Sequence, residues 1–227
     1  MRVAVVIPAL DEEGWIAESV ASAAAGNAQL VAEIIVADGG SRDGTGHRAE
    51  ACGARIVRSP KGRAQQLEAG VHASDAEALL FLHADTRLPP GFAESIVEAL
   101  ADPAVVGGAF RFGFAAPRTP SLRIVEWAAR VRSEALRLPY GDQALFVRRR
   151  ALAAIGGIPR VPILEDLDLV AAMKQHGRFV ILPLAVQTSA RRYEANGVWR
   201  TVAQHAVAVG AWWIGVDRTR IARWVGR

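Results

Sequence analysis

The chain contains 227 residues with a formal net charge of +4, a pI near 9.9 and one cysteine. Hydrophobic residues make up 51%, and no Pro-, Gly- or Ser-rich linker interrupts the sequence; these features exclude disordered, collagen-like and coiled-coil proteins and predict a single domain, residues 1–227. The arginines are scattered, so we expect a phosphorylated small molecule, not nucleic acid, as partner. Cys52 has no disulfide partner and no apolar stretch reaches about 18 residues, so we expect a cytoplasmic protein.

Apolar runs alternate with helical spacings through the first hundred residues. We expect strands at residues 2–8, 34–38, 54–58 and 78–82, and helices at 13–26, 43–52, 62–73 and 90–101. Continuous apolar strands separated by helices predict an α/β fold of Rossmann-like type, with a mostly parallel sheet flanked by helices. We interpret residues 1–100 as a nucleotide-binding half, whose ligand lies beyond the carboxyl ends of the strands.

The second half is less regular. We expect a strand at residues 105–114, a helix at 121–137, a short strand at 141–147, a helix ending at Gly156-Gly157 and a helix from Glu165 to about His176. Residues 196–227 are expected to form a C-terminal helical segment.

Acidic residues gather at the predicted strand ends and turns. Asp38 and Asp43 flank a glycine-rich turn, which lets backbone approach a ligand closely, but both acids suit turn and helix-capping roles equally well. The patterns G-x-x-x-x-G-K-[ST] and G-x-G-x-x-G are absent, which disfavours ordinary kinases and dinucleotide oxidoreductases.

The segment HADT at 83–86 follows an apolar strand. Because His83 and Asp85 are two positions apart at the end of a strand, their side chains lie on the same face of the sheet. One or two carboxylates together with substrate phosphates are enough to hold Mg²⁺ or Mn²⁺. Capping of the helix at 90–101 is the alternative, and position alone slightly favours it.

The segment EDLD at 165–168 begins a predicted helix, where the helix dipole stabilises carboxylates. One of these acids suits a capping role. Three acids in four residues exceed what capping needs, so one of them is a candidate base for deprotonating an acceptor hydroxyl.

Five segments together resemble the family 2 glycosyltransferases, which adopt the GT-A fold of nucleotide-diphospho-sugar transferases. They are VAVVIPALDEE (3–13), IIVADGGSRDGT (34–45), LLFLHADT (79–86), YGDQALFVRR (140–149) and ILEDLDL (163–169). The resemblance covers roughly residues 3–195. KGRAQQLEAG (61–70) and SARRY (189–193) resemble most the small soluble bacterial branch associated with radical-SAM and selenium-domain proteins.

The resemblance implies a nucleoside diphosphate sugar as donor, with a UDP-sugar favoured. The nucleotide-binding residues that it implies are Pro8, Ala9, Asp11, Glu12, Asp38, Gly39, Arg63 and Ala84. Asp38 would accept a hydrogen bond from the nucleobase, and Asp85 would hold Mn²⁺ or Mg²⁺, with His83 beside it.

The resemblance also assigns the reaction. Asp166 would be the general base of an inverting displacement, and residues 101–195 would form the acceptor and sugar half. The sugar and acceptor residues would be Gly141, Asp142, Gln143 and Glu165, and the diphosphate residues Arg191 and Arg192. Taken by position alone, Asp142 equally suits a turn, and the two arginines equally suit a solvated basic turn.

Three residues depart from the family pattern. His83 replaces the first acid of the D-x-D motif, Asp11 stands where Asn is common, and Gly39 replaces the second acid of D-D-G-S. If His83 is a ligand, its softer nitrogen shifts the preference from Mg²⁺ toward Mn²⁺.

The expected activity is therefore metal-dependent, inverting sugar transfer to an unknown hydroxyl acceptor, either a lipid or a small molecule. One alternative is a sugar nucleotidyltransferase, which should carry G-x-G-x-R after the first strand, where this chain has PALDEEG. The other is a nucleotide-sugar binding protein that has lost catalysis through the changes at His83 and Gly39.

The C-terminal segment at 198–227 combines four tryptophans with several arginines. This composition suits a helix that lies on the inner face of the membrane. Packing of a terminal helix, or a homodimer contact, also explains it and is the preferred interpretation.

Overall fold

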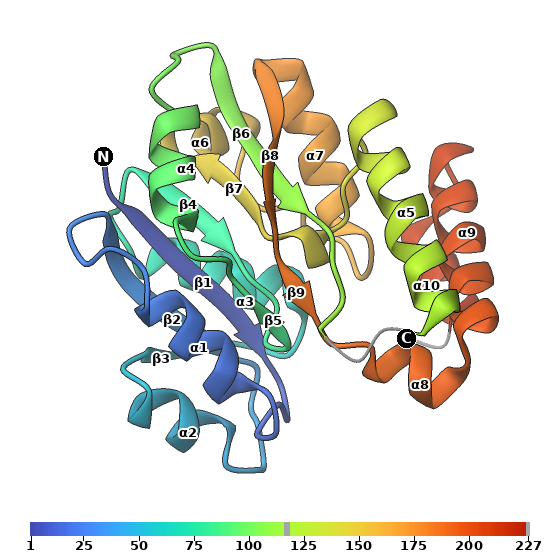
Figure 1. Ribbon diagram of the computed structural model, residues 1–227, viewed down its shortest axis with the longest axis horizontal. Helices are drawn as coiled ribbons and strands as arrows, with labels where there is room; N and C mark the ends of the chain where they lie inside the picture. The colour runs from blue at the N-terminus through green and yellow to red at the C-terminus, as the bar shows by residue number, and fades with distance from the viewer. Residues whose placement is uncertain (116–118, 226–227) are drawn as a thin grey trace.

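The computed structural model describes residues 1–115 and 119–225 (Figure 1). Its main sheet has the strand order β3-β2-β1-β4-β7-β6-β8. The strands are β1 (Val3–Ala9), β2 (Val31–Asp38), β3 (Arg55–Arg58), β4 (Ala78–Phe81), β6 (Val105–Arg111), β7 (Leu145–Arg148) and β8 (Arg178–Ala185). β7 alone runs antiparallel to its neighbours, β4 and β6, so the predicted mostly parallel sheet is confirmed.

Helices cover both faces of this sheet. On one face, Val3, Val5 and Ile7 pack in the core that includes residues of α1 (Ile16–Ala24), α2 (Thr45–Ala51) and α4 (Phe92–Ala99). On the other face, Ala4 and Val6 pack in the core with residues of α3 (Arg63–His72), α6 (Arg149–Ile155) and α7 (Glu165–His176). Burial on both faces explains why β1 has no polar alternation.

Gly70 shows how closely α3 approaches the sheet. A Cβ atom at this position would lie 2.2 Å from Cγ1 of Val6. The glycine therefore brings α3 directly onto β1, and with it Arg63, the first residue of the helix.

The structure corrects several predicted boundaries. The first helix begins at Ile16 rather than 13, and β6 ends at Arg111 rather than 114. The strand expected at 141–147 starts only at Leu145, because residues 141–143 form a 3-10 turn, η1 (Gly141–Gln143). The predicted helix ends at Gly156 and His176 are confirmed.

The chain after β8 builds a further helical layer beside the sheet (Figure 1). β9 (Gln187–Thr188) pairs with β5 (Thr86–Arg87), and the helices are α8 (Arg191–Asn196), α9 (Val198–Trp213) and α10 (Arg218–Trp224), with α5 (Pro120–Ala135) beside α9. In the part of the chain that the structure describes, no helix is long and apolar enough to cross a membrane.

Candidate active site

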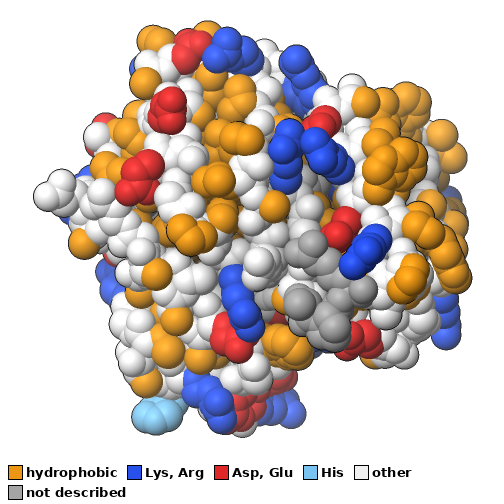
Figure 2. Space-filling view, in the orientation of Figure 1, with side chains coloured by type: hydrophobic (Ala, Val, Ile, Leu, Met, Phe, Trp, Pro, Cys, Tyr) orange, Lys and Arg blue, Asp and Glu red, His pale blue; other side chains and the backbone are white. Residues whose placement is uncertain are grey.

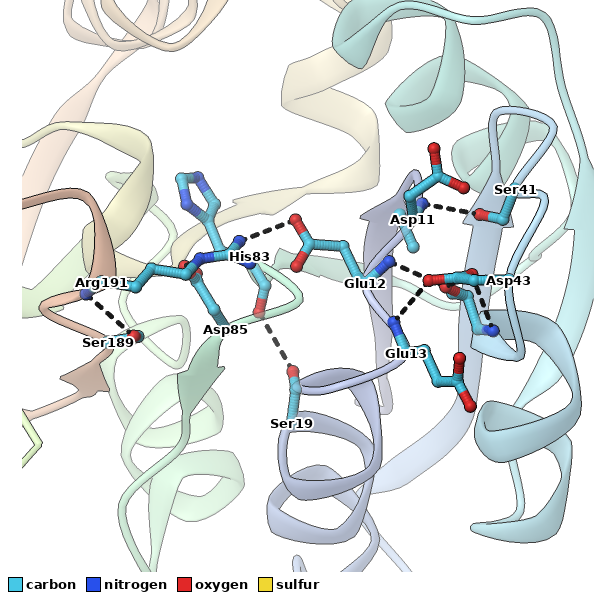
Figure 3. Close-up of polar contacts among 12 residues, drawn as sticks. Asp11, Glu12, Glu13, Ser19, Ser41, Asp43, His83, Asp85, Ser189 and Arg191 are labelled. Carbon is cyan, nitrogen blue, oxygen red and sulfur yellow. Dashed lines mark hydrogen bonds and ion pairs between the residues drawn. The ribbon is translucent and has the colours of Figure 1, made fainter. Parts of the chain in front are cut away.

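The loops after β1, β2 and β4 lie at one edge of the sheet, because these strands are parallel. Backbone and side chains tie the first two loops together (Figure 3). Asp11 accepts a hydrogen bond from the Arg42 amide (2.8 Å), and the Glu13 amide donates to Asp43 (3.1 Å). Asp11 has a φ of 54°, in the left-handed region. Asp11 and Asp43 thus hold two loops in place.

Asp38 and Gly39 follow β2. Asp38 Oδ1 accepts from the Ser41 amide at 3.0 Å and from its hydroxyl, which is a local turn contact. Gln66, a buried polar residue that the sequence did not single out, donates to the carbonyls of Ala9 (2.6 Å) and Ala37 (3.1 Å). Its amide nitrogen would lie 3.0 Å from a Cβ at Gly39. The structure therefore places these residues around the strand ends.

A cavity of about 420 Å³ opens beyond β1 and β4; we call it the first cavity. Nine of the sequence-derived site residues line it: Pro8, Glu12, Arg63, His83, Ala84, Asp85, Asp142, Arg191 and Arg192. Ala9, Asp11, Asp38 and Gly39 lie beside it at the strand ends rather than among its lining residues. The topology brings together side chains that are as much as 184 positions apart in the chain, between Pro8 and Arg192.

Arg191 joins two of these acids (Figure 3). Its Nε donates to Asp85 Oδ2 at 2.9 Å and its Nη2 to Glu12 Oε1 at 2.7 Å. The second oxygen of Glu12, Oε2, is buried and has no hydrogen-bond partner among the described residues. One guanidinium thus pairs with two carboxylates, which leaves a net negative charge in this cluster and one buried acceptor unused.

The carboxylates of Asp85 and Glu12 suit a divalent cation only if a bound ligand supplies further oxygen donors. Within residues 1–115 and 119–225, no group of three or more His, Cys, Asp and Glu side chains could hold a metal ion. Asp85 and the unused oxygen of Glu12 are hard oxygen donors, which suit Mn²⁺ or Mg²⁺ when phosphate oxygens complete the coordination. The donor set therefore fits a cation that binds together with a diphosphate.

A second cavity, of about 450 Å³, adjoins the first. The two share Arg63, His83, Asp142, Arg192 and His205 as lining residues. The second cavity is also lined by Tyr140, Ile163, Leu164, Glu165, Asp166, Leu167, Asn196, Gln204, Ala208, Val209 and Val225. The two cavities therefore adjoin along these five residues.

Asp166 is oriented by the backbone. The Gly141 amide donates to its Oδ2 at 2.7 Å, and the Leu167 amide to its Oδ1 at 2.9 Å. Leu164, just before α7, has a φ of 65°, a strained conformation for a branched residue. The Asp166 carboxylate is thus held at the N-terminus of α7, where it lines the second cavity.

Gly141 allows three charged or polar side chains to meet. A Cβ atom there would lie 2.3 Å from Arg63 Nη2, 3.0 Å from Asp166 Oδ2 and 3.2 Å from His83 Nε2. Arg63 contacts His83 and also pairs with Glu165, with Nε 2.9 Å from Oε1. Glu165 therefore positions Arg63, and Arg63 in turn contacts His83.

Asp142 lies where the two cavities meet. Burial raises the pKa of its carboxyl to about 6; the neighbouring Asp166 charge adds to the rise and the Arg132 charge opposes it. Its Oδ1 is buried and has no hydrogen-bond partner in the described part of the chain. A carboxyl in this state can bind a sugar hydroxyl.

Gln143, the next residue, lies outside both cavities. Its side chain is fully buried, its amide donates to the Phe110 carbonyl at 2.8 Å, and its oxygen accepts from Arg132 at 3.2 Å. Gln143 holds η1 against β6, which is a role in the local structure.

Several lining residues were not anticipated from the sequence. Tyr140, Tyr193, Asn196, Gln204 and His205 come mostly from helices with no strand-end signal. Burial raises the pKa values of the Tyr140 and Tyr193 hydroxyls, so both remain hydrogen-bond donors at neutral pH. His205 packs edge-on against both rings.

The mostly parallel sheet with helices on both faces is the GT-A fold of glycosyltransferases. Solved structures of glucosyl-3-phosphoglycerate synthase from Mycobacterium tuberculosis share this fold. The complex with Mn²⁺, UDP and glucosyl-3-phosphoglycerate matches with a TM-score of 0.62 and 24% identity, over 81% of this chain and 70% of that one. The complex with Mg²⁺ and UDP matches with 0.61 and 24%, over 83% and 69%. A complex with Mn²⁺, UDP and phosphoglyceric acid matches with 0.65 and 22%, over 95% and 79%.

The family model described as glycosyl transferase family 2 matches residues 4–155. The chain belongs to this family and is an enzyme of the transferase class. No protein with curated annotation matches the chain significantly.

Proposed function

We propose that the protein transfers a sugar from a nucleoside diphosphate sugar, with UDP as the favoured nucleotide, to a hydroxyl acceptor with inversion at the anomeric carbon. The observation that carries the proposal is the pair of adjoining cavities: one holds Asp85, Glu12 and Arg191, and the other holds the backbone-oriented Asp166. This arrangement separates a donor site from an acceptor site. The acceptor is a lipid or a small molecule.

The donor diphosphate would lie in the first cavity. Asp85, with Glu12 beside it, would hold Mn²⁺ or Mg²⁺, and this cation would neutralise the charge that develops on the leaving diphosphate. The solved structures of similar fold contain UDP with Mn²⁺ or Mg²⁺, which supports the proposal. Arg191 already pairs with both acids, whereas Arg192 lines both cavities and has no carboxylate partner among the described residues. Arg192 is therefore the better placed of the two for binding phosphate.

Asp166 would act as the base. Its carboxylate accepts the proton of the acceptor hydroxyl while the hydroxyl oxygen forms a bond to the anomeric carbon of the sugar. The bond from that carbon to the diphosphate oxygen breaks, and the nucleoside diphosphate leaves with the electron pair. Attack from the side opposite the leaving group inverts the anomeric configuration. Asp142, between the two cavities, would bind a hydroxyl of the transferred sugar.

The finer assignment to the branch associated with radical-SAM and selenium-domain proteins rests on residues 61–70 and 189–193. The first segment supplies Arg63 and Gln66, and the second supplies Arg191, Arg192 and Tyr193, all of which line the first cavity. The two segments that distinguish this branch therefore both contribute to the proposed donor site. The nucleotidyltransferase alternative has no comparable support, since the loop after β1 lacks the arginine of G-x-G-x-R.

A thermal-shift panel of nucleotides crossed with Mg²⁺ and Mn²⁺ tests the proposal. UDP with Mn²⁺ at saturating concentration should raise Tm by roughly 5 to 10 °C, because a ligand that binds only the folded state stabilises it by mass action. UDP alone should give a smaller shift. An absence of any shift with UDP- and GDP-sugars in the presence of Mn²⁺ would refute the proposal.

A further inference from the structure

The large exposed hydrophobic side chains are concentrated on the helical layer beside the sheet. Among the described residues, all of them except Met1 and Trp15 belong to α5, α9, α10 or the residues that directly follow these helices. They are Ile124, Trp127, Val131, Leu136, Trp199, Val207, Trp213, Ile214 and Trp224. Hydrophobic atoms gather over α5 and α9 in Figure 2. We call this set the helical apolar surface.

Helical periodicity makes this surface continuous along each helix. On α5, Ile124, Trp127 and Val131 are spaced three and four positions apart and so share one face. On α9, Trp199, Val207 and Trp213 are exposed, and the other exposed positions between Trp199 and Trp213 are Arg200, Ala203, Ala206 and Gly210. Trp213 and Ile214 are 78% and 80% exposed. Clusters of this size on a protein surface usually mark a binding face.

The three helices of the helical apolar surface carry seven arginines and two acids, Glu126 and Glu134, both on α5. α9 contains one charged residue, Arg200, and α10 contains three arginines and no acid. Arg218 pairs with Asp168, but Arg123, Arg200, Arg220 and Arg223 have no carboxylate partner within the described residues. The surface thus combines exposed tryptophan with unpaired arginine.

We propose that the helical apolar surface binds the headgroup region of an anionic lipid bilayer. Tryptophan has an apolar ring and a polar N–H, which suits the boundary between headgroups and acyl chains, and arginine is attracted to anionic headgroups. A second copy of the chain fits less well, because a two-fold contact would bring equivalent unpaired arginines toward each other. The positive charge therefore favours lipid over a dimer.

The surface is connected to the second cavity through α9. The inner side of this helix lines that cavity with Gln204, His205 and Val209, while its outer side carries Trp199 and Trp213. If the proposed function holds, the acceptor is an amphiphile whose hydroxyl group is presented at the depth of the headgroups. Vesicle binding itself does not depend on that activity, so the test below separates the two proposals.

The full-length protein can be sedimented with two kinds of vesicle: phosphatidylcholine alone, and equimolar phosphatidylcholine and phosphatidylglycerol. We expect binding to the anionic vesicles, weakened by high salt, and at least tenfold weaker binding to the neutral ones. Tryptophan emission should shift to shorter wavelength on binding. Failure to bind anionic vesicles would overturn the proposal.

Two double variants and one matched control sharpen the test. Trp199→Gln with Trp213→Gln should lower affinity for anionic vesicles by about tenfold or more, and Arg220→Gln with Arg223→Gln should do the same. The control, Arg150→Gln with Arg178→Gln, removes two exposed positive charges elsewhere and should bind like the wild type. Unchanged binding of both test variants would contradict the proposal. A wild-type dimer that the tryptophan variant dissociates would also contradict it, and would assign the surface to a second copy.

Discussion

Asp85 and Asp142 are both strand-end or turn acids, yet their surroundings differ. Asp85 pairs with the guanidinium of Arg191 at 2.9 Å and shares this partner with Glu12. Asp142 is half-buried, its buried Oδ1 is unpaired, and its pKa is raised to about 6. A cation that enters at Asp85 must therefore displace or rearrange an ion pair, whereas a hydroxyl that enters at Asp142 satisfies a vacant acceptor.

Asp85→Asn tests the metal assignment. The amide should weaken Mn²⁺ binding in the presence of UDP by about tenfold or more, because a hard cation prefers a charged oxygen ligand. Titration calorimetry of Mn²⁺ into the UDP complex measures this, with Asp75→Asn, an exposed acid elsewhere, as control. Equal Mn²⁺ affinity in Asp85→Asn and wild type would rule out Asp85 as the ligand.

Asp142 also makes stability depend on pH. Its pKa is higher in the folded state than in the unfolded chain, so the folded protein binds more protons and this group's contribution to stability falls as pH rises from about 4 to 6. The substitution Asp142→Asn removes this pH-dependent contribution to stability. The free energy of unfolding of the variant, relative to that of the wild type, should therefore increase as the pH rises from 4 to 7, by about 3 kcal/mol at most. Denaturant unfolding at both pH values measures it, and a difference that is constant with pH would contradict the assignment.

The EDLD segment shows how one helix start serves two purposes. Asp166 faces the second cavity, whereas Asp168, two residues later, accepts hydrogen bonds from Trp212 Nε1 (2.6 Å) and Arg218 Nη2 (2.7 Å). Asp168 thus attaches α9 and α10 to α7. The sequence predicted that one of the three acids acts as a base and did not predict this attachment, because its contacts are 44 and 50 positions away and no local pattern reveals them.

Asp168→Asn should therefore act on stability rather than on the donor site. Loss of charged hydrogen bonds to two half-buried partners should cost about 2 kcal/mol and lower Tm by about 5 °C. Scanning calorimetry measures the change, with Arg220→Gln as the control, because Arg220 lies on α10 beside Arg218 but does not bond to Asp168. If Tm is unchanged, α9 and α10 are held by packing alone.

Across the whole molecule, sequence reasoning was most successful where the structure is most regular. Continuous apolar runs such as Val3–Ile7 predicted the parallel strands. A strand that is buried on both faces of a sheet carries apolar side chains at nearly every position, and this pattern is visible in the sequence. The 3-10 turn at Gly141–Gln143 was missed, since Gln143 bonds to Phe110 and Arg132, partners that only the tertiary fold supplies.

The candidate site also has a part that the sequence predicts and a part that it does not. Strand-end acids such as Asp85 are visible in the sequence, because parallel strands bring their carboxyl ends to one edge. Residues of the helical layer, such as Gln204 and His205, reach the cavities only through the packing of α9, and their spacing is that of an ordinary helix. The part of the cavities that α9 lines is therefore the part that required the structure.

In the proposed mechanism Asp166 is the base of a nucleotide-sugar transfer, and the variant Asp166→Asn tests this role. UDP release from a UDP-sugar with Mn²⁺, with water as acceptor, should fall by about a hundredfold or more in the variant. Affinity for UDP with Mn²⁺ should stay within about twofold, because Asp166 lies in the second cavity and not in the first. Turnover near the wild-type rate in Asp166→Asn, with the fold intact, would contradict the account.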